Sequence, residues 1–415
     1  MTLAVYRILI NLIFLFSPII ILIRILKGKE DLNRFPEKLG FFSKKKVGKK
    51  LIWFHGASVG ELLSVIPLIE NLEKDKNIDQ ILLTSSTISS AKVFSKFKFK
   101  KTIHQFFPID SNIISKKFIN FWKPSISIFI DSEIWPNIIL NLNKEKTPII
   151  LLNARITKKS FKRWKILKNF ADKIFQCFSN TYPCNKETQD FLKFFGVKNI
   201  NLINNLKFTQ KKITNNKIPY KLSKFFKNRD FWCASSTHNG EEEICINSHQ
   251  ELKKNYKNFV SIIIPRHVDR KEEIIDILKN NNLKFYCHSS NKPIPNDTEV
   301  YLVDTYGETE VFYNLNKVVF MGGSMIKHGG QNPLEAVRHG CKIIHGPNVE
   351  NFRDIYKLLN EKNISKKIKS KKSLIKQVKQ CLKSGKRSNL IVKKIDDIGI
   401  DILKAITKEL KIIIK

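Results

Sequence analysis

Short apolar runs alternate with longer amphipathic segments along most of this chain. In the first half, such runs predict buried β-strands at residues 51–55, 81–84, 126–130, 148–152, 175–178 and 199–202. In the second half, the same pattern predicts strands at residues 231–234, 260–264, 284–287, 300–303, 318–321 and 341–345. Helical segments separate most of these runs. The alternation predicts an α/β protein with two doubly wound units, each built on a parallel sheet.

The N-terminus follows a different pattern. Residues Leu3 to Leu26 are almost wholly apolar, and no charge occurs from Ile8 to Ile23. This uncharged stretch is close to the roughly 17 residues needed to span a bilayer. Basic residues follow it, so the positive-inside rule predicts an anchor helix that leaves the rest of the chain in the cytoplasm. The alternative is a buried or interfacial helix.

These patterns divide the chain of 415 residues into four parts. We expect a membrane-anchor helix at residues 1–27 and an N-terminal α/β domain at 28–208. A polar, lysine-rich linker is expected at 209–228. The second domain is expected at 229–415, and it would end in an amphipathic helix with Ile395, Ile398, Ile402, Ile406 and Leu410 at helical spacing.

The net charge of +37 at first favours a nucleic-acid-binding protein. However, the lysines are spread over nearly every segment, and the chain is equally rich in Asn, Ile and Phe. That combined bias is typical of an A/T-rich coding sequence. No RNA-binding aromatic signature or zinc knuckle accompanies it, so we expect no nucleic acid partner. A basic surface also suits anionic lipid headgroups. The seven cysteines contain no Cys-x-x-Cys pair, which favours buried free thiols in a reducing compartment.

A glycine-rich corner stands out at residues 317–354. A strand ends at Gly322-Gly323, and Gly329-Gly330 then leads to Asn332-Pro333 and a short helix closed by Gly340. Helix N-termini bind anions, because unpaired N–H groups and the macrodipole both favour negative charge. Glu335 would repel a bare phosphate but could hold a sugar hydroxyl, which favours a nucleotide-sugar site. The alternative interpretation is a tight packing corner.

Two carboxylates follow strands of the first half. Glu61 lies at a strand-to-helix turn, where it could act as a base on a hydroxyl or simply stabilise the helix start. Glu133 follows another strand, in Asp131-Ser132-Glu133. Because the ends of parallel strands meet at one edge of a sheet, these two carboxylates could share acceptor binding and proton handling.

The second half carries polar groups at similar places. Ser236 and Thr237 precede Glu241 and Glu242, as in a capping box, but their hydroxyls also follow a strand. Arg266 ends a further strand, where its forked guanidinium suits a phosphate. No His pair with zinc spacing, Asp-x-Asp or Gly-x-x-x-x-Gly-Lys-Ser/Thr motif occurs, so we expect no metal site and no cofactor.

Taken together, these segments resemble the 3-deoxy-D-manno-octulosonic acid (Kdo) transferases of lipopolysaccharide synthesis. The first-half matches are HGASVGE at 55–61, SSTISSAKVF at 85–94, DSEIWPN at 131–137 and NARITKKSFKRW at 153–164. The second-half matches are SSTHNGEEE at 235–243, PRH at 265–267, VFMGGSMIKHGGQNPLEAVRHG at 319–340 and HGPNVENFRD at 345–354. The resemblance extends from the apolar N-terminus to about residue 360, and the motifs follow one another in the same order as in the family.

The resemblance implies a GT-B glycosyltransferase, with two Rossmann-like domains facing across a cleft. Its donor would be CMP-Kdo, its acceptor a lipid A precursor, and its location the cytoplasmic face of the inner membrane. The transfer would invert the anomeric centre and require no metal. A second candidate is another membrane-associated GT-B transferase with a UDP-sugar or polyol-phosphate donor. A membrane-tethered nucleic-acid-binding protein is a rival from a different class.

The resemblance also implies roles for individual residues. Glu61 is the expected general base, and Glu133 the second essential carboxylate. The expected donor-binding residues are Lys207, Ser236, Thr237, Arg266, Gly322, Gly323, Gly329, Gly330, Asn332 and Glu335. This chain departs from the family pattern at residues 204–209, which read NNLKFT without the family's glycine and aspartate, and at Gln331, where the family has histidine.

Overall fold

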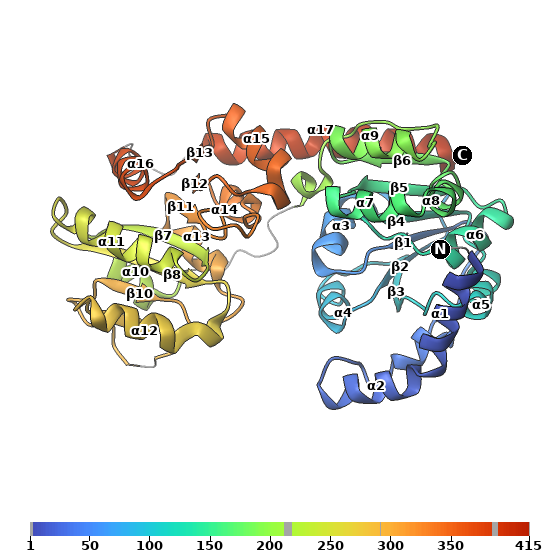
Figure 1. The fold of residues 1–415 in the computed structure, drawn as a ribbon, viewed down its shortest axis with the longest axis horizontal. Helices are drawn as coiled ribbons and strands as arrows, with labels where there is room; N and C mark the ends of the chain where they lie inside the picture. Colours follow the sequence, from blue (N-terminus) through green and yellow to red (C-terminus); the bar gives the residue numbers. More distant parts are fainter. Residues whose placement is uncertain (1–2, 211–217, 291, 384–388, 415) are drawn as a thin grey trace. The chain divides into compact units, whose positions relative to one another are not determined.

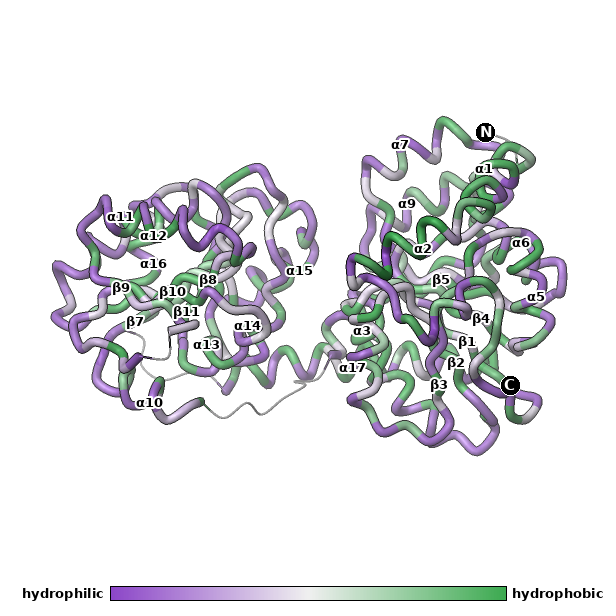
Figure 2. Tube along the Cα trace, turned by 90° about the horizontal axis from the view of Figure 1, so that it is seen from below, coloured by the Kyte–Doolittle hydropathy of each residue, from purple (hydrophilic) through white to green (hydrophobic). Residues whose placement is uncertain are grey.

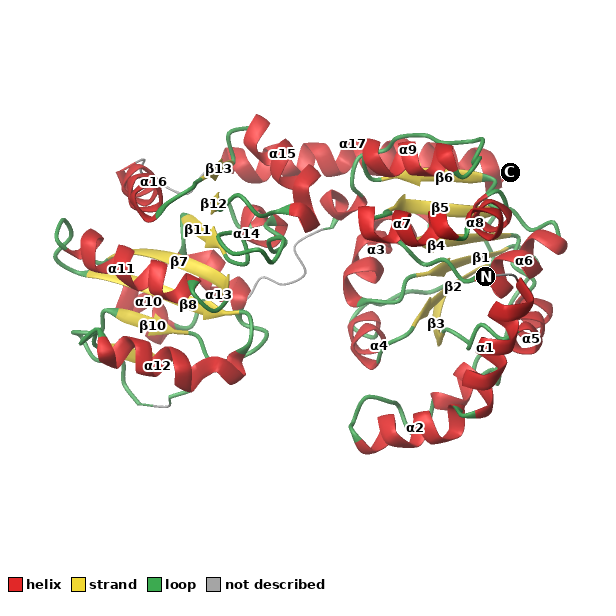
Figure 3. Cartoon of the chain, viewed as in Figure 1, coloured by secondary structure: helices red, strands yellow, loops and turns green. Residues whose placement is uncertain are grey.

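Two compact α/β units make up the molecule. The computed structural model describes residues 3–210, 218–290, 292–383 and 389–414. The first unit contains Met1–Lys211 and Ile398–Lys415, and the second contains Lys212–Asp397. Each unit has a single sheet with helices packed around it (Figures 1 and 3).

The first sheet has six parallel strands in the order β3-β2-β1-β4-β5-β6. The strands are β1 (Leu51–His55), β2 (Gln80–Ser85), β3 (Thr102–Phe106), β4 (Ile126–Ile130), β5 (Ile149–Ala154) and β6 (Asn180–Pro183). The helices of this unit are α1 (Leu3–Leu15), α2 (Ser17–Leu26), α3 (Val59–Leu72), α4 (Ile88–Phe94), α5 (Asn112–Trp122), α6 (Pro136–Lys144), α7 (Lys158–Ile166), α8 (Lys168–Phe175) and α9 (Lys186–Phe194), with 3₁₀ turns η1 (Phe35–Leu39) and η2 (Leu206–Thr209).

The second sheet has seven parallel strands in the order β13-β12-β11-β7-β8-β10-β9. The strands are β7 (Asp230–Thr237), β8 (Phe259–Pro265), β9 (Phe285–Cys287), β10 (Val300–Leu302), β11 (Val318–Met321), β12 (Lys342–His345) and β13 (Ser365–Lys367). The helices are α10 (Tyr220–Phe226), α11 (Glu241–Lys253), α12 (Lys271–Asn280), α13 (Thr309–Leu315), α14 (Leu334–Arg338), α15 (Arg353–Glu361), α16 (Lys371–Lys383) and the start of α17 (Asn389–Ile414), with 3₁₀ turns η3 (Val268–Arg270) and η4 (Glu350–Phe352).

Burial on both faces explains why the central strands are apolar without alternation. Every residue of β1, β4 and β8 is buried, as expected for parallel strands covered by helices on both sides. Trp53 of β1 packs in the first core against Phe118 and Phe129, with ring centroids 4.9 and 5.4 Å away. The continuous apolar runs therefore predicted the central strands correctly.

Edge strands were predicted less well. The apolar run 175–178 is not a strand, because Phe175 ends α8, where Phe170, Ala171 and Ile174 are buried at helical spacing. The strand lies further on, at β6. Residues 199–202 contribute only an isolated bridge between Thr181 and Ile200. The pattern also missed β3 and β13. The sequence of β3, TIHQF, mixes polar and apolar residues, and that of β13, SKK, is wholly polar.

The apolar N-terminus forms two helices instead of the single expected one. Helix α1 ends at Leu15 and α2 begins at Ser17, with Pro18 in its first turn. Proline is suited to a helix start and unsuited to a helix interior, which explains the break. Within the described residues no single helix is long and apolar enough to cross a membrane, whereas α1 and α2 together, bent by 52°, have the length and composition of a broken span. Figure 2 shows the apolar character of both helices.

Polar contacts attach α1 to the loop after β3 and to α6. The Tyr6 hydroxyl donates to Asp110 Oδ2 at 2.7 Å, and Arg7 Nε donates to Asn137 Oδ1 at 3.0 Å. Asp110 also accepts from the backbone N–H groups of Asn137 and Ile138 at the start of α6. One side of α1 is therefore part of the folded unit.

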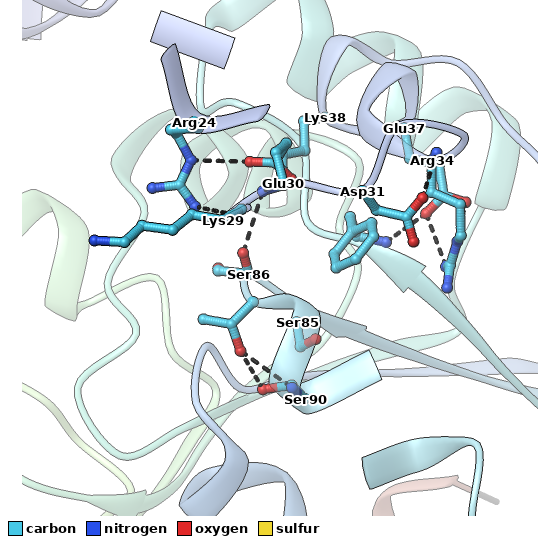
Figure 4. A network of polar contacts seen from close by, with 12 residues as sticks. Arg24, Lys29, Glu30, Asp31, Arg34, Glu37, Lys38, Ser85, Ser86 and Ser90 are labelled. Atoms are coloured by element: carbon cyan, nitrogen blue, oxygen red, sulfur yellow. Dashed lines mark hydrogen bonds and ion pairs between the residues drawn. The ribbon is translucent and has the colours of Figure 1, made fainter. Parts of the chain in front are cut away.

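The end of α2 is held by a buried carboxylate (Figure 4). Glu30 accepts from Arg24 Nε at 2.9 Å and pairs with Lys38 Nζ at 2.7 Å. Lys38 also donates to the carbonyl of Ser86, just beyond β2. This network places Arg24 and Lys38 beside the carboxyl ends of the first strands.

The predicted domain boundaries need two corrections. The second half of α17 belongs to the first unit instead of the second, because Ile402, Ile406 and Leu410 are buried there and Tyr182 donates to Glu409 at 3.2 Å. The expected linker 209–228 contains α10, which buries Leu222, Phe225 and Phe226. Residues 211–217 of that linker lie outside the described part. None of the seven cysteines, all of which are described, forms a disulfide.

Candidate active site

Strand order alone marks one ligand-binding position in each sheet. In open parallel sheets, ligands bind beyond the carboxyl ends of the strands where the order reverses. In the first sheet this switch point lies between β1 and β4, and in the second between β7 and β11. The segments after these four strands contain Glu61, Glu133, Ser236 and Gly322.

Glu61 stands in the first turn of α3, immediately after β1. Its carboxylate accepts from the Ser58 backbone N–H at 3.1 Å, and its own N–H donates to Ser58 Oγ at 3.4 Å. These reciprocal bonds form a capping box, so Glu61 does stabilise the start of α3. Glu61 is nevertheless only partly buried, and its Oε1 takes no part in the cap.

Glu133 follows β4 and is held by two donors. His55 Nε2 lies 3.1 Å from Glu133 Oε2, and Trp135 Nε1 donates to the same oxygen at 2.8 Å. Burial alone would raise the pKa of Glu133. The hydrogen bond and charge of His55, together with the Trp135 bond, outweigh it and hold the pKa below its ordinary value.

The two carboxylates interact electrostatically. Desolvation raises the pKa of Glu61, and repulsion from Glu133 and then Asp131 raises it further, while the Ser58 bonds oppose the shift. The neighbours therefore have pKa values pushed in opposite directions. This is the pattern of a basic carboxylate next to one that stays ionised, and it occurs at the position where acid–base chemistry is expected.

Asp131 and Asn153 support the carboxylate pair from the ends of β4 and β5. Both have left-handed backbone, with φ of 57° and 55°, an uncommon conformation for residues other than glycine. The Asn153 side-chain amide donates to Asp131, and Lys207 Nζ lies 3.3 Å from Asp131 Oδ2. The predicted donor-binding residue Lys207 is thus placed in the first unit, beside these carboxylates.

In the second unit, Ser236, Arg266 and Gly322 lie at three neighbouring strand ends. The Arg266 backbone N–H donates to the Thr237 carbonyl, and that of Gly322 donates to the Ser235 carbonyl. A Cβ at Gly322 would lie 2.2 Å from the Ser236 carbonyl oxygen, so only glycine fits. Arg266 is exposed and has no carboxylate partner among the described residues. Thr237, by contrast, is fully buried.

The first amides of the glycine loop after β11, those of Gly323, Ser324 and Met325, are already bound within the protein. Glu241, fully buried at the start of α11, accepts from Gly323 N at 2.6 Å, Ser324 N at 3.0 Å and Met325 N at 2.9 Å. It also accepts from the backbone N–H of His238. An internal carboxylate occupies this anion-binding nest. The expected capping box from Ser236 or Thr237 is absent too, since Gly240 precedes α11 without a side-chain cap.

A histidine group borders Arg266. The ring of His238 lies 4.1 Å from that of His328 and 6.0 Å from that of His267, centroid to centroid. Burial, then the charges of His328, His267 and Arg266, lower the pKa of His238 to about 4. Gln331 Nε2 lies 3.1 Å from His238 Nε2, so Gln331 contacts the same group of residues as Arg266.

The remaining predicted donor residues surround α14. Asn332 Oδ1 accepts from the Leu334 N–H at 3.1 Å and starts the helix, while Glu335 is exposed and accepts from Thr309 Oγ1 at 3.1 Å. Gly329 and Gly330 have φ of 98° and 75°. Helix α14 has only five residues, fewer than the sequence indicated.

Sequence reasoning missed His55, Asn153 and Glu241 as parts of these sites. The position of His55 at a strand end and of Asn153 in the motif NARITKKSFKRW were the available signals. Nothing local marks Glu241 as the partner of a loop 80 residues away in sequence order, since that contact depends on the β7–β11 pairing. Within the described residues no group of three or more His, Cys, Asp or Glu side chains could hold a metal ion.

The two parallel-sheet α/β units resemble the GT-B fold of glycosyltransferases. A solved structure of UDP-GlcNAc 2-epimerase from Neisseria meningitidis bound to UDP-GlcNAc has a TM-score of 0.59 and 13% identity, covering 87% of this chain and 99% of that one. At that identity the likeness concerns the fold alone.

Sequence relatives define the family. A family model for 3-deoxy-D-manno-octulosonic-acid transferase (kdotransferase) matches residues 33–210. The 3-deoxy-D-manno-octulosonic acid transferase of Rickettsia bellii is 37% identical over 376 residues, which cover 89% of this chain and 89% of that protein. The transferase of the same name from Haemophilus influenzae is 30% identical, covering 79% and 78%. The chain belongs to the family of 3-deoxy-D-manno-octulosonic acid transferases.

Proposed function

We propose that this protein transfers Kdo from CMP-Kdo to a lipid A precursor in lipopolysaccharide synthesis. The observation that carries the proposal is the Glu61–Glu133 pair at the β1–β4 switch point, in a chain of the Kdo transferase family. Both glutamates lie within residues 33–210, which match the family model.

In the proposed reaction, ionised Glu61 accepts the proton of the acceptor hydroxyl. The hydroxyl oxygen then bonds to the anomeric carbon of Kdo, the bond from that carbon to the phosphate oxygen breaks, and CMP leaves with the electron pair. Attack opposite the leaving group inverts the anomeric centre. Repulsion from Glu133 makes Glu61 a stronger base than an isolated glutamate, which assists this step.

The leaving group needs charge stabilisation more than protonation, because CMP departs as a phosphate monoester. Arg266 suits that task, since it is exposed at the end of β8 and lacks a carboxylate partner among the described residues. The amides of Gly323 and Ser324 are less suitable, because Glu241 already accepts from both. We therefore assign the phosphate to Arg266, and the nucleoside to the segment from Gly329 to Glu335.

The acceptor is an anionic lipid, which fits an enzyme held at the cytoplasmic face of the inner membrane. Helices α1 and α2 expose several large apolar residues, including Ile8, Leu9, Ile19 and Leu22. Arg24, on the same helix as Ile19 and Leu22, has a side chain that is 40% exposed and could meet anionic headgroups. Because one side of α1 is bound to Asp110 and Asn137, we propose that this pair lies in the interface instead of spanning the bilayer.

A donor-choice assay tests the proposed function. Purified protein is given a lipid A precursor with labelled CMP-Kdo or a labelled UDP-sugar, and the lipid product is analysed by mass. We expect addition of Kdo from CMP-Kdo alone. Transfer from the UDP-sugar in preference to CMP-Kdo would contradict the proposal.

A further inference from the structure

His55 is a buried histidine that the proposed reaction does not yet use. It ends β1 with only 1% of its surface exposed. Its Nε2 faces Glu133 Oε2 at 3.1 Å. A carboxylate that stays ionised can only accept, so Nε2 is the proton-bearing nitrogen of this contact.

The opposite edge of the ring is fixed by β2. His55 Nδ1 lies 3.0 Å from Thr84 Oγ1 and 3.3 Å from the Thr84 carbonyl oxygen. Thr84 Oγ1 is itself held by Trp53 Nε1 at 2.9 Å. The ring also stacks on Phe107, with centroids 3.6 Å apart and planes 18° apart. With both edges and a face constrained, His55 presents its Nε2–H in one direction.

Several charged groups surround the carboxylate that His55 contacts. Glu61 faces Glu133 from α3, and Asp131 precedes it at the end of β4. Asp131 is paired with Lys207 of η2. Among the described residues, Trp135 also donates a side-chain hydrogen bond to Glu133, and its indole is neutral. His55 is thus the one group in this set that can meet Glu133 with both a hydrogen bond and a positive charge.

We propose that His55 is a positioning residue, which fixes the Glu133 carboxylate and keeps it ionised beside the base Glu61. The inference rests on the proposed function, because it assigns Glu61 as the base. An ionised Glu133 repels the ionised form of Glu61 and so increases its basicity, whereas a protonated Glu133 would not. A residue that acts on Glu133 therefore influences proton removal from the acceptor hydroxyl without contacting the acceptor.

Two substitutions separate positioning from packing. His55→Phe keeps the stack on Phe107 but removes both N–H groups. His55→Gln retains an N–H donor without the charge. For His55→Phe we expect kcat to fall roughly 10- to 100-fold with KM values little changed, in the range seen when groups that orient site residues are removed. The acid limb of its pH–rate profile should begin at higher pH, because without His55 the first proton taken up by the carboxylate pair goes more easily to Glu133, whereas in Glu133→Gln only Glu61 is left to titrate. His55→Gln should recover part of kcat.

A double-mutant comparison makes the test independent of folding. If His55 acts through Glu133, adding His55→Phe to Glu133→Gln should cause no further loss of kcat and no further shift of the acid limb. An equal extra loss in that background would overturn the inference. Should His55→Phe fail to fold, an acid limb for folded His55→Gln that coincides with that of the unchanged protein would overturn it too.

Failure of this inference can be told from failure of the proposed function. Turnover that survives Glu61→Gln would remove the proposed base, whatever His55 does. An inactive Glu61→Gln together with unchanged kcat and pH profile in His55→Phe would remove only the role of His55.

Discussion

At the scale of single residues, the first-unit site is two glutamates in different surroundings. Glu61 is only partly buried and is repelled by Glu133 and Asp131, whereas Glu133 receives hydrogen bonds from His55 and Trp135. Environment alone therefore gives chemically identical side chains different tasks, one as a base and the other as a fixed anion.

The pH dependence of transfer should report this pair. Glu61 works as a base only when ionised, so activity is present above its pKa and is lost as pH falls through it. Because that pKa is raised, the acid limb should lie above the range of an ordinary glutamate. Glu133→Gln removes the repulsion, so the acid limb of its residual activity should move to lower pH. A limb that stays in place would show that the two carboxylates are not coupled.

Glu241 should matter for stability. Glu241→Gln leaves one acceptor oxygen for four backbone N–H groups, so buried donors lose their partner and unfolding should become easier by about 1–3 kcal/mol. Denaturant unfolding measures the change. Glu243→Gln, at an exposed position of the same helix, is the matched control and should have little effect. Equal stability of the two variants would contradict the role given to Glu241.

Residue roles were only partly predictable. Glu61 and Glu133 could be found, because each directly follows an apolar run that forms a central strand. The contact of Glu241 with the glycine loop could not be found from the sequence. Glycines followed by a helix give the same pattern whether a ligand or an internal carboxylate binds the loop amides. That distinction depends on contacts between segments far apart in the sequence.

At the scale of elements, hydrophobic pattern predicted strands in proportion to their burial. Strands β1, β4 and β8 are covered on both faces and have continuous apolar sequences. The edge strand β13 has the sequence SKK and carries no such signal. Phe175 was assigned to a strand because three apolar residues in a run of four do not reveal the helical period of α8.

Helices α1 and α2 yield a prediction about membrane binding. Leu9 and Leu22 are 50% and 57% exposed, so replacing both with Glu should weaken binding to anionic vesicles while leaving the fold intact. Vesicle flotation measures the bound fraction. Leu390→Glu, at a residue of α17 that is 60% exposed, is the control and should bind as the unchanged protein does. Undiminished flotation of the double variant would contradict an interfacial role for α1 and α2.

At the scale of the whole molecule, the same topological rule places both candidate sites. Each sheet has a switch point beside its first strand, β1 or β7, and the candidate site residues follow the strands that flank that switch point. The sequence predicted two parallel-sheet units from alternation alone. It misplaced the C-terminal helix, because amphipathic spacing shows that α17 packs on a core without showing which core.

The central claim is that Glu61 is the base of Kdo transfer. The most direct test compares the protein with Glu61→Gln for product formation from CMP-Kdo and a lipid A precursor, alongside CMP binding and thermal unfolding. Glu61→Gln keeps the size and much of the capping geometry of the side chain but cannot take up the proton. We predict that its turnover is abolished while its CMP affinity and unfolding temperature stay close to those of the unchanged protein. Turnover retained by folded Glu61→Gln would contradict the account.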